Sequence, residues 1–309
     1  VIPEGATAEN NYTVNGVTYD SKTVNVKVTV TYNKETGELK AELAKDSEAI
    51  AFQNSYDTET SIGLEGTKSL SGRTLKDGEF TFEVKDKAGK VVATGSNKSD
   101  GSISFNNKLN YKLSDLEKAD GSYESEKTYE YTVNEVIPEG ATAENNYTVN
   151  GVTYDNSIFT VKVIVSYDQA TGIMSAAFAE DSQELIFDNT YDAKGSLTLE
   201  ASKTLKNKAL EADAFNFVLK DKNGETIQTV ANDADGNVTF SPLNYTLKDV
   251  GTHVYTVSEV QRENTEVTYD TTEYTVEVTV ADAGNGKLKV SKTIKKGDDT
   301  VDAIAFENI

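Results

Sequence analysis

Two lysines stand at positions where a β-strand would point its side chains into a protein core. In the stretch SIGLEGTKSL, the two-residue period of a strand places Lys68 on one face with Leu64 and Leu70. The stretch SLTLEASKTL places Lys203 among leucines in the same way. An unpaired ammonium group is too costly to bury in an apolar core. Each lysine is therefore expected to have a buried partner from another part of the chain.

A glutamate and an asparagine recur on apolar strand faces with the same regularity. The glutamates close the pattern Tyr-x-Val-x-Glu, as Glu135 in YEYTVNEV and Glu259 in HVYTVSEV. The asparagines stand two positions after a phenylalanine, as Asn54 in AIAFQNSY, Asn189 in ELIFDNTY and Asn308 in AIAFENI. An inward lysine, glutamate and asparagine thus follow one another, in this order, in two separate parts of the chain.

Such a trio can close an isopeptide bond between the lysine amine and the asparagine carboxamide. Burial disfavours charge, so it lowers the pKa of the lysine and raises the pKa of the glutamate. The neutral amine can then attack the carboxamide, while the protonated glutamate hydrogen-bonds the carbonyl, stabilises the oxyanion and shuttles protons as ammonia leaves. A rigid fold supplies the proximity that this otherwise very slow amidation needs.

Each of the three residue types also has a plainer interpretation. The lysines could snorkel or form salt bridges, and the asparagines could be buried amides that complete strand hydrogen bonds. A buried Glu–Lys ion pair would leave the same pattern in the sequence. One triad explains all three features together.

Internal repetition divides the chain into units. Residues 1–20 are identical to residues 136–155, and the same offset of 135 positions separates Asn54 from Asn189. We expect the carboxy-terminal part of a truncated repeat at residues 1–57 and two complete repeats at residues 58–192 and 193–309.

Asn54 lacks a lysine and a glutamate of its own repeat in this arrangement. We attribute this to cropping of a longer array, with strand complementation from a neighbouring molecule as the alternative.

Strand-like alternation runs through every repeat. Segments such as EFTFEVKD, AFNFVLKD and FTVKVIVSY alternate apolar and polar residues, and KAGK, KNGE, TGE, TGI and GNGK are typical of the turns between strands. No window shows a sustained apolar period of 3.6 residues. Short strands with turns at regular spacing are typical of a sandwich, so we predict an all-β fold.

Charge and composition exclude several kinds of partner and site. The formal net charge of −21 disfavours nucleic acid and anionic lipid as partners. No apolar run reaches the roughly 18 residues that a membrane-spanning helix requires. The absence of cysteine excludes disulfides and thiolate metal sites, and a single histidine excludes a His-based triad in each repeat. The acidic stretch NDADGNV resembles a calcium loop, but its counterpart NKSDGSI keeps few of the ligands, so we expect a hairpin turn and no metal or cofactor.

The order of lysine in the first strand, glutamate in Y-x-V-x-E and asparagine in F-x-N-x-Y resembles the isopeptide-linkage domain of Gram-positive pilins, of the streptococcal major-pilin type. The resemblance covers essentially the whole chain. It implies tandem Ig-like β-sandwiches with Lys–Asn bonds that form without an added enzyme. The implied triads are Lys68, Glu135 and Asn189 in one repeat and Lys203, Glu259 and Asn308 in the other, with Asn54 unpaired.

The resemblance implies a structural stalk of a surface pilus or adhesin, extracellular and attached to the cell wall. Its crosslinking is single-turnover chemistry, so the chain is not expected to be an enzyme. Neighbouring repeats or subunits of the same fibre are the expected partners, and a host ligand would be bound by a tip domain outside this segment. The chain contains no sorting signal or polymerisation motif, so a polymerised pilin and a single-chain adhesin stalk both stay open. The rival functions are a ligand-binding adhesin module and an accessory module of a secreted hydrolase.

Overall fold

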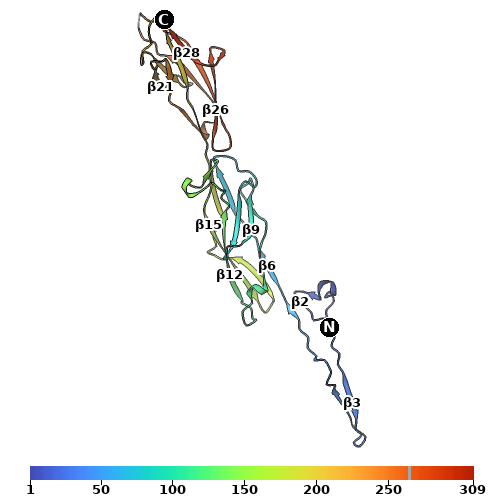
Figure 1. The fold of residues 1–309 in the computed structure, drawn as a ribbon. Helices are drawn as coiled ribbons and strands as arrows, with labels where there is room; N and C mark the ends of the chain where they lie inside the picture. Colours follow the sequence, from blue (N-terminus) through green and yellow to red (C-terminus); the bar gives the residue numbers. More distant parts are fainter. Residues whose placement is uncertain (264–265) are drawn as a thin grey trace.

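A computed structural model describes residues 1–263 and 266–309 and confirms the predicted all-β class. The chain is elongated, and successive parts of the sequence follow one another along its length (Figure 1). We call residues 1–57, 58–192 and 193–309, the bounds expected from the repeats, the N-terminal, middle and C-terminal units. Short 3-10 turns are the helical elements among the described residues, at Ala8–Asn10, Leu113–Leu116, Ala143–Asn145 and Leu247–Asp249. In the described part of the chain, no helix has the length and apolarity needed to cross a membrane.

The middle unit is a sandwich of two sheets. One sheet has the strand order β10-β9-β8-β12-β15-β16, and the other has the order β13-β14-β17-β7. The strands β11 and β6 form a separate pair, and β6 contacts β16 of the first sheet. The first set comprises Ile103–Phe105 (β10), Val91–Asn97 (β9), Thr81–Asp86 (β8), Glu126–Glu135 (β12), Ile158–Asp168 (β15) and Ile173–Phe178 (β16). The second comprises Thr148–Val149 (β13), Val152–Thr153 (β14), Ile186–Tyr191 (β17) and Thr67–Ser71 (β7), and the separate pair comprises Leu109–Lys112 (β11) and Glu59–Ile62 (β6). The rings of Phe82 and Phe187 pack between the sheets with their centroids 4.8 Å apart.

The C-terminal unit repeats this architecture. Its large sheet has the order β21-β20-β24-β25-β26-β27, and it faces β22-β19-β28 and the pair β18-β23. The large sheet comprises Thr226–Ala231 (β21), Asn216–Lys220 (β20), Gly251–Glu259 (β24), Glu273–Asp282 (β25), Leu288–Lys296 (β26) and Asp299–Val301 (β27). The other strands are Asn237–Thr239 (β22), Glu200–Leu205 (β19), Ile304–Asn308 (β28), Lys194–Leu197 (β18) and Leu243–Thr246 (β23). Phe217 and Phe306 occupy the places of Phe82 and Phe187, with their centroids 5.1 Å apart.

The N-terminal unit contains only two small sheets. Their orders are β1-β2-β5 and β3-β4. The strands are Thr13–Val14 (β1), Val17–Thr18 (β2), Ser55–Tyr56 (β5), Val28–Tyr32 (β3) and Leu39–Leu43 (β4). Every residue of β3, β4 and β5 is exposed, so this unit has no core of the kind that the other two units have.

The predicted turns connect antiparallel strands, and acidic side chains stabilise several of them. KAGK joins β8 to β9, and the Asp86 carboxylate accepts the backbone N–H of Ala88 and of Lys90 at 2.9 Å. NDADGNV is also an acidic turn, because Asp233 Oδ1 accepts the backbone N–H of Asp235 and of Asn237. It leads from β21 (Thr226–Ala231) to β22 (Asn237–Thr239), which lie in different sheets, so it is not the expected hairpin turn. The Asp233 carboxylate is thus occupied by its own turn.

The stretch SIGLEGTKSL is not one continuous strand, and that part of the sequence interpretation is wrong. β6 pairs antiparallel with β11, whereas β7 pairs parallel with β17, so the chain changes partner between them. Gly66 lies at the change, where a Cβ atom would come within 3.0 Å of the Leu185 Cβ and 3.2 Å of Ile103 Cδ1. The inward direction of Lys68 nevertheless persists, because it depends only on the alternation within β7.

A tyrosine at the end of one unit contacts a hairpin turn of the next unit at both joints. Tyr191 Oη donates to Asp282 Oδ1 at 2.6 Å and accepts the backbone N–H of Gly286 at 3.3 Å. Tyr56 Oη donates to the carbonyl of Gly172 at 2.5 Å. Both tyrosines stand two positions after an asparagine of the F-x-N-x-Y pattern. The strand that carries the asparagine is thus coupled directly to the following unit.

Replacing Tyr191 with phenylalanine is expected to loosen the second joint, because it removes both hydrogen bonds but keeps the ring. The chain has no cysteine, so one can be introduced at an exposed position in each unit for spin labelling. Pulsed EPR should show a broader distance distribution between the middle and C-terminal units. Tyr56→Phe is the matched control, since it should broaden only the first joint. An unchanged distribution in Tyr191→Phe would contradict this role.

Candidate functional site

All six residues of the two predicted triads are buried inside a sandwich. At most 4 % of any of them is exposed. Each lysine lies in the first strand of the small sheet, each glutamate at the end of a central strand of the large sheet, and each asparagine in the last strand. These positions are Lys68 in β7, Glu135 in β12, Asn189 in β17, Lys203 in β19, Glu259 in β24 and Asn308 in β28.

The strand registers bring the lysine and the asparagine to adjacent strands. β7 and β17 run parallel, and Asn189 is paired with Leu70, two residues beyond Lys68. Because alternate residues share a face, both side chains point into the core. In the C-terminal unit, Asn308 is paired with Leu205, two residues beyond Lys203. The same geometry is therefore built twice.

The glutamate bridges the other two side chains with its two oxygens. Lys68 Nζ donates to Glu135 Oε2 at 2.8 Å, and Asn189 Nδ2 donates to Glu135 Oε1 at 2.7 Å. In the C-terminal unit, Lys203 Nζ lies 2.7 Å from Glu259 Oε2, and Asn308 Nδ2 lies 2.7 Å from Glu259 Oε1. A plain buried ion pair would need no asparagine on the second oxygen.

The asparagine oxygen is held by a backbone donor. The N–H of Asp155 donates to Asn189 Oδ1 at 2.7 Å, and the N–H of Asp270 donates to Asn308 Oδ1 at 2.7 Å. A backbone N–H can only donate, so the atom that faces it is the carbonyl oxygen and the amide nitrogen faces the glutamate. The sequence interpretation assigned the carbonyl to the glutamate, and this is corrected. The oxyanion would form against a backbone N–H, while the glutamate contacts the nitrogen that leaves.

The side chain of the same aspartate ties this donor to the asparagine strand. Asp155 Oδ2 accepts the N–H of Asp188, the residue before Asn189, at 3.0 Å, and its Oδ1 accepts the N–H of Ser157 at 2.9 Å. Burial alone would raise the pKa of Asp155, but these hydrogen bonds and the nearby Lys68 lower it below its usual range. Asp270 makes the same contacts, to the N–H groups of Glu307 and Thr272.

Burial shifts the protonation equilibrium in the direction that the chemistry requires. It lowers the pKa of Lys68 and of Lys203 and raises the pKa of Glu135, although the Lys68–Glu135 hydrogen bond opposes both shifts in that pair. The Phe80 ring lies beside the amine, with its centroid 4.9 Å from Lys68 Nζ, and completes the dry surroundings. A proton can therefore pass from the lysine to the glutamate and leave a neutral amine.

This arrangement can carry a complete amidation. The glutamate takes a proton from the lysine, and the neutral Nζ forms a bond to the asparagine Cγ. Negative charge develops on Oδ1, where the backbone N–H lies. The Cγ–Nδ2 bond then breaks, and the glutamate gives its proton to the departing nitrogen, which leaves as ammonia. Nζ gives its second proton to the same carboxylate as the link forms, so the glutamate receives two protons, returns one and ends protonated, and no other reactant is needed.

Two other buried asparagines have only structural contacts. Asn97 Oδ1 accepts the N–H of Phe80 at 2.7 Å, and Asn232 Oδ1 accepts the N–H of Phe215 at 2.9 Å. Their Nδ2 groups donate to backbone carbonyls. These two residues fit the plainer interpretation of a buried amide, and the triad asparagines differ from them by facing a carboxylate.

Asn54 retains one contact of the triad geometry. The backbone N–H of Asp20 donates to Asn54 Oδ1 at 3.0 Å. Asp20 Oδ2 accepts the N–H of Gln53 at 3.1 Å, as its counterparts do in the other units. Asn54 itself is exposed.

The sequence interpretation missed the aspartates and Phe80. A signal for the aspartates was present, because VTYD occurs in all three units and ends at Asp20, Asp155 and Asp270. Their importance comes from a backbone N–H group, and the residue type does not reveal which backbone group will be used. Phe80 belongs to the alternating segment EFTFEVKD, where it reads as an ordinary core residue.

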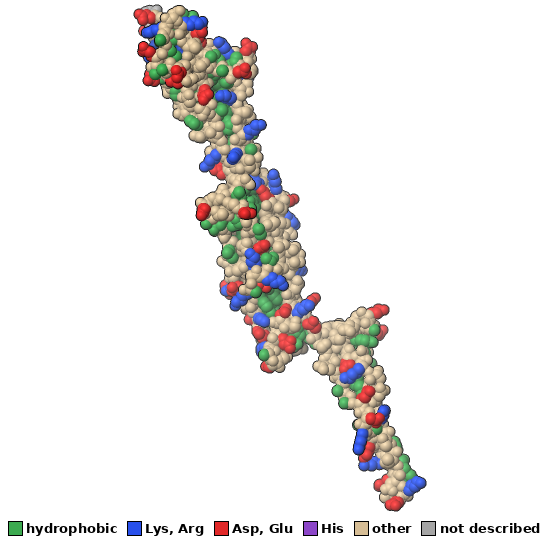
Figure 2. All heavy atoms as spheres, in the orientation of Figure 1, with side chains coloured by type: hydrophobic (Ala, Val, Ile, Leu, Met, Phe, Trp, Pro, Cys, Tyr) green, Lys and Arg blue, Asp and Glu red, His purple; other side chains and the backbone are tan. Residues whose placement is uncertain are grey.

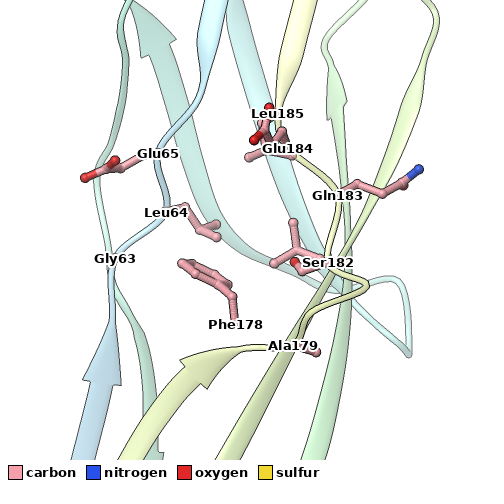
Figure 3. A pocket seen from close by; sticks show the side chains of 10 residues that line it. Gly63, Leu64, Glu65, Phe178, Ala179, Ser182, Gln183, Glu184 and Leu185 are labelled. Carbon is pink, nitrogen blue, oxygen red and sulfur yellow. The ribbon is translucent and has the colours of Figure 1, made fainter.

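A surface hollow of the middle unit lies away from the triads. It has a volume of about 410 Å³ and lies between the segment of residues 63–65 and the loop of residues 178–185 (Figure 3). Leu64 and Phe178 point toward each other across it, and Glu65 and Gln183 point outward. Within the described part of the chain, no group of three or more histidine, cysteine, aspartate or glutamate residues is placed to hold a metal ion.

Replacing Asp155 with alanine is expected to slow formation of the Lys68–Asn189 link roughly 10- to 100-fold, because the oxyanion donor and the asparagine strand lose their common clamp. Peptide mass mapping at intervals after synthesis would measure the linked fraction. The Lys203–Asn308 link in the same molecule is the internal control. Asp181→Ala, which removes an exposed carboxylate paired with Lys162, should have no effect. Equal rates in Asp155→Ala and the unaltered chain would contradict this role.

Comparison with known proteins yields one family match. The model for the Spy0128-like isopeptide-containing domain matches residues 5–57, 64–192 and 199–309. No curated protein sequence matches the chain.

Several solved structures show partial similarity. A variant of the major pilin from Streptococcus pyogenes is 18 % identical, with 79 % of this chain and 97 % of that chain covered and a TM-score of 0.27. The TIE protein of Bacillus anthracis is 13 % identical, with 95 % and 42 % covered and a TM-score of 0.26. A C-terminal fragment of the pilus adhesin SpaC from Lactobacillus rhamnosus GG is 14 % identical, with 79 % and 95 % covered and a TM-score of 0.29. The assignment to a family therefore depends on the family model, which covers nearly the whole chain.

Proposed function

Because the chain belongs to the family of Spy0128-like isopeptide-containing domains, we propose that it is a structural stalk segment of a Gram-positive surface pilus or adhesin, stabilised by self-formed Lys–Asn crosslinks. The links join Lys68 to Asn189 and Lys203 to Asn308. Glu135 and Glu259 transfer the protons.

The observation that supports this proposal best is the buried glutamate between the two reacting nitrogens. One carboxylate contacts Lys68 Nζ and Asn189 Nδ2 in the middle unit, and the same contacts recur in the C-terminal unit. A buried ion pair is expensive to maintain for stability alone. The chain has two copies of this pair. In each copy an asparagine contacts the second glutamate oxygen and a backbone N–H contacts the asparagine carbonyl, which suits the Lys–Asn amidation.

The positions of the links suit a fibre under tension. Each link joins the first strand of the small sheet to the last strand of the same unit, and the C-terminal unit begins directly after β17, the last strand of the middle unit. Force that enters near Lys68 then passes through the covalent bond to Asn189 and bypasses the sandwich. Each link forms once and is not turned over, so the chain works as a structural protein and not as an enzyme.

Tryptic mapping tests the proposal directly. Trypsin does not cleave after a lysine whose amine is amidated, so Lys68 should lie inside a peptide of residues 46–73. That peptide should be joined to one of residues 163–194, and a second branched pair should join residues 195–206 to 297–309. Recovery of only the linear peptides that end at Lys68 and Lys203 would overturn the proposed crosslinks.

We further propose an extracellular location with attachment to the cell wall, and neighbouring subunits or repeats of the same fibre as partners. A ligand-binding adhesin module is the second candidate, and the hollow beside Leu64 is its best location on the middle unit (Figure 3). A stalk should not bind mucin, collagen or glycan arrays. Saturable binding that Phe178→Ala abolishes would favour the adhesin function instead.

A further inference from the structure

The hollow beside Leu64 lies where the inward row of side chains on β16 stops (Figure 3). Met174 and Phe178 stand on the inward face of this strand, and the strand ends at Phe178. Met174 is buried, whereas Phe178, at the edge of the hollow, is 45 % exposed. Val161 of β15 and Leu185 are buried and complete the apolar lining. The hollow thus lies where a further inward side chain of β16 would stand.

The C-terminal unit has such a side chain at the corresponding place. The segments FTVKVIV of β15 and YTVEVTV of β25 align Val161 with Val276. Beside Val276, β26 places Ile294, which is 5 % exposed. β26 has nine residues against six in β16, and β27 follows it and pairs Val301 with Ile294. Ile294 therefore stands, beside the core valine, at the position that is hollow in the middle unit.

The loop after β16 is too short to cover this position. Six residues lie between Phe178 and Leu185, whereas eleven lie between their counterparts Lys292 and Ile304. The additional residues build the end of β26 and all of β27. The middle unit thus has the same apolar surroundings without the segment that covers them.

Side chains of the short loop close the edge of β15. Ser182 Oγ accepts the backbone N–H of Lys162 at 3.2 Å, and Gln183 Oε1 accepts the backbone N–H of Thr160 at 2.6 Å. The backbone N–H of Gln183 also donates to the carbonyl of Thr160 at 3.0 Å. Because these edge groups are already paired, a partner would not extend the sheet here. An occupant would instead insert a side chain into the hollow.

The rim of the hollow is acidic. Glu65 and Glu184 line it, and both are exposed. Among the residues that the structure describes, neither carboxylate forms an ion pair. Carboxylates beside an apolar recess favour an aliphatic group with positive charge next to it. The segment that fills the corresponding place in the C-terminal unit has this chemistry, because Ile294 lies in the sequence KTIKK.

We infer that the hollow beside Leu64 is a docking site for a partner protein that inserts an aliphatic side chain flanked by lysines. The aliphatic group would contact Leu64, Val161 and Phe178, and the lysines would approach Glu65 and Glu184. Such a site would hold a second protein at the side of the stalk, which goes beyond the proposed function and does not depend on the crosslinks. A second copy of this chain is not the expected occupant, because its KTIKK segment is part of its own β26.

The first test uses a capped peptide of residues 291–297, SKTIKKG, as the probe. It is titrated into the full chain with isotope-labelled leucine and valine methyl groups. The NMR signals of Leu64 and Val161 should shift saturably. Their counterparts Leu199 and Val276 are 0 % exposed, so their signals should stay in place and serve as the internal control. Equal shifts in the two units would overturn the inference.

Matched peptides and chains separate docking from attraction by charge alone. Acidic side chains occur along the visible surface of the chain, so a cationic peptide would be attracted to many places (Figure 2). The peptide with Ile294→Ser keeps the charge but loses the aliphatic group, so it should bind roughly tenfold more weakly or less. Glu65→Gln with Glu184→Gln in the chain should weaken binding of the unaltered peptide roughly threefold at low salt. Glu117→Gln with Glu126→Gln, which do not line the hollow, should have no effect. Equal binding of the two peptides would overturn the inference.

A blocking variant tests the hollow without removing a core side chain. A Cβ atom at Gly63, which lines the hollow, has no heavy atom within 4 Å, so Gly63→Phe should fold, with an unchanged melting temperature as the check. This variant should lose binding of the unaltered peptide. Retained binding would show that the peptide does not use the hollow. A concentration-dependent dimer of the unaltered chain that Gly63→Phe abolishes would show that a second copy occupies it, and either result would overturn the inference.

Discussion

Replacing Glu135 with alanine is expected to leave Lys68 and Asn189 unlinked, so that the chain retains one ammonia, about 17 Da, that the unaltered chain loses. The reason is that one carboxylate contacts both reacting nitrogens, at 2.8 Å and 2.7 Å, and no second acid is needed in the reaction. Glu259→Ala should retain the other ammonia, and the double variant should have the full calculated mass. Intact-protein mass spectrometry checks each case.

The same variants should also lose stability. A link that closes a loop of ~100 residues restricts the unfolded chain by about 4.7 kcal/mol on the loop-entropy model. For a unit of this size, that corresponds to a melting temperature lower by roughly 15 °C.

Glu135→Gln, which keeps the length of the side chain, should retain the same ammonia as Glu135→Ala, because an amide cannot carry the proton. Glu130→Ala is the matched control on the exposed side of β12. Normal link formation in Glu135→Ala would mean that the wrong carboxylate has been assigned.

Pulling on the two ends of the chain is expected to unfold neither the middle nor the C-terminal unit completely. Lys68 and Asn189 lie 121 residues apart in the sequence, and the link would exclude the whole stretch between them from extension. In Glu135→Ala that stretch becomes free, and single-molecule force spectroscopy should show a new extension step of roughly 400 Å, at about 3.5 Å per residue. The change is large because the link lies near both ends of the unit.

The C-terminal unit, which carries the other proposed link, supplies the comparison for this experiment. Glu259→Ala should release the stretch between Lys203 and Asn308, which lie 105 residues apart, in a step of roughly 350 Å. Each single variant should show only its own step, and the double variant should show both. Extension steps of these lengths in the unaltered chain would contradict a load path through the two links.

The inward direction of the triad residues could be predicted from the sequence because it depends on local alternation. Lys68, Glu135 and Asn189 each lie in a strand whose apolar neighbours identify the core face. The all-β class and the hairpin turns follow from the same short-range patterns. Repetition strengthened these predictions, since the same three residue types recurred on core faces in the same order.

Other features depend on contacts between distant parts of the chain and could not be predicted. The strand break near Gly66 is set by the approach of Leu185, which lies 119 residues further along. The proposed oxyanion donor is the backbone N–H of Asp155, so no side-chain pattern specifies its role. The contact of Tyr191 with Asp282 joins two units, and alternation within one strand carries no information about it.

The intact mass of the folded, unaltered chain tests the central claim most directly. Two Lys–Asn links predict a mass about 34 Da below the value calculated from the sequence, because each link loses one ammonia. A folded chain with the full calculated mass would show that Lys68 and Lys203 keep their amines, and the self-crosslinked stalk would be contradicted.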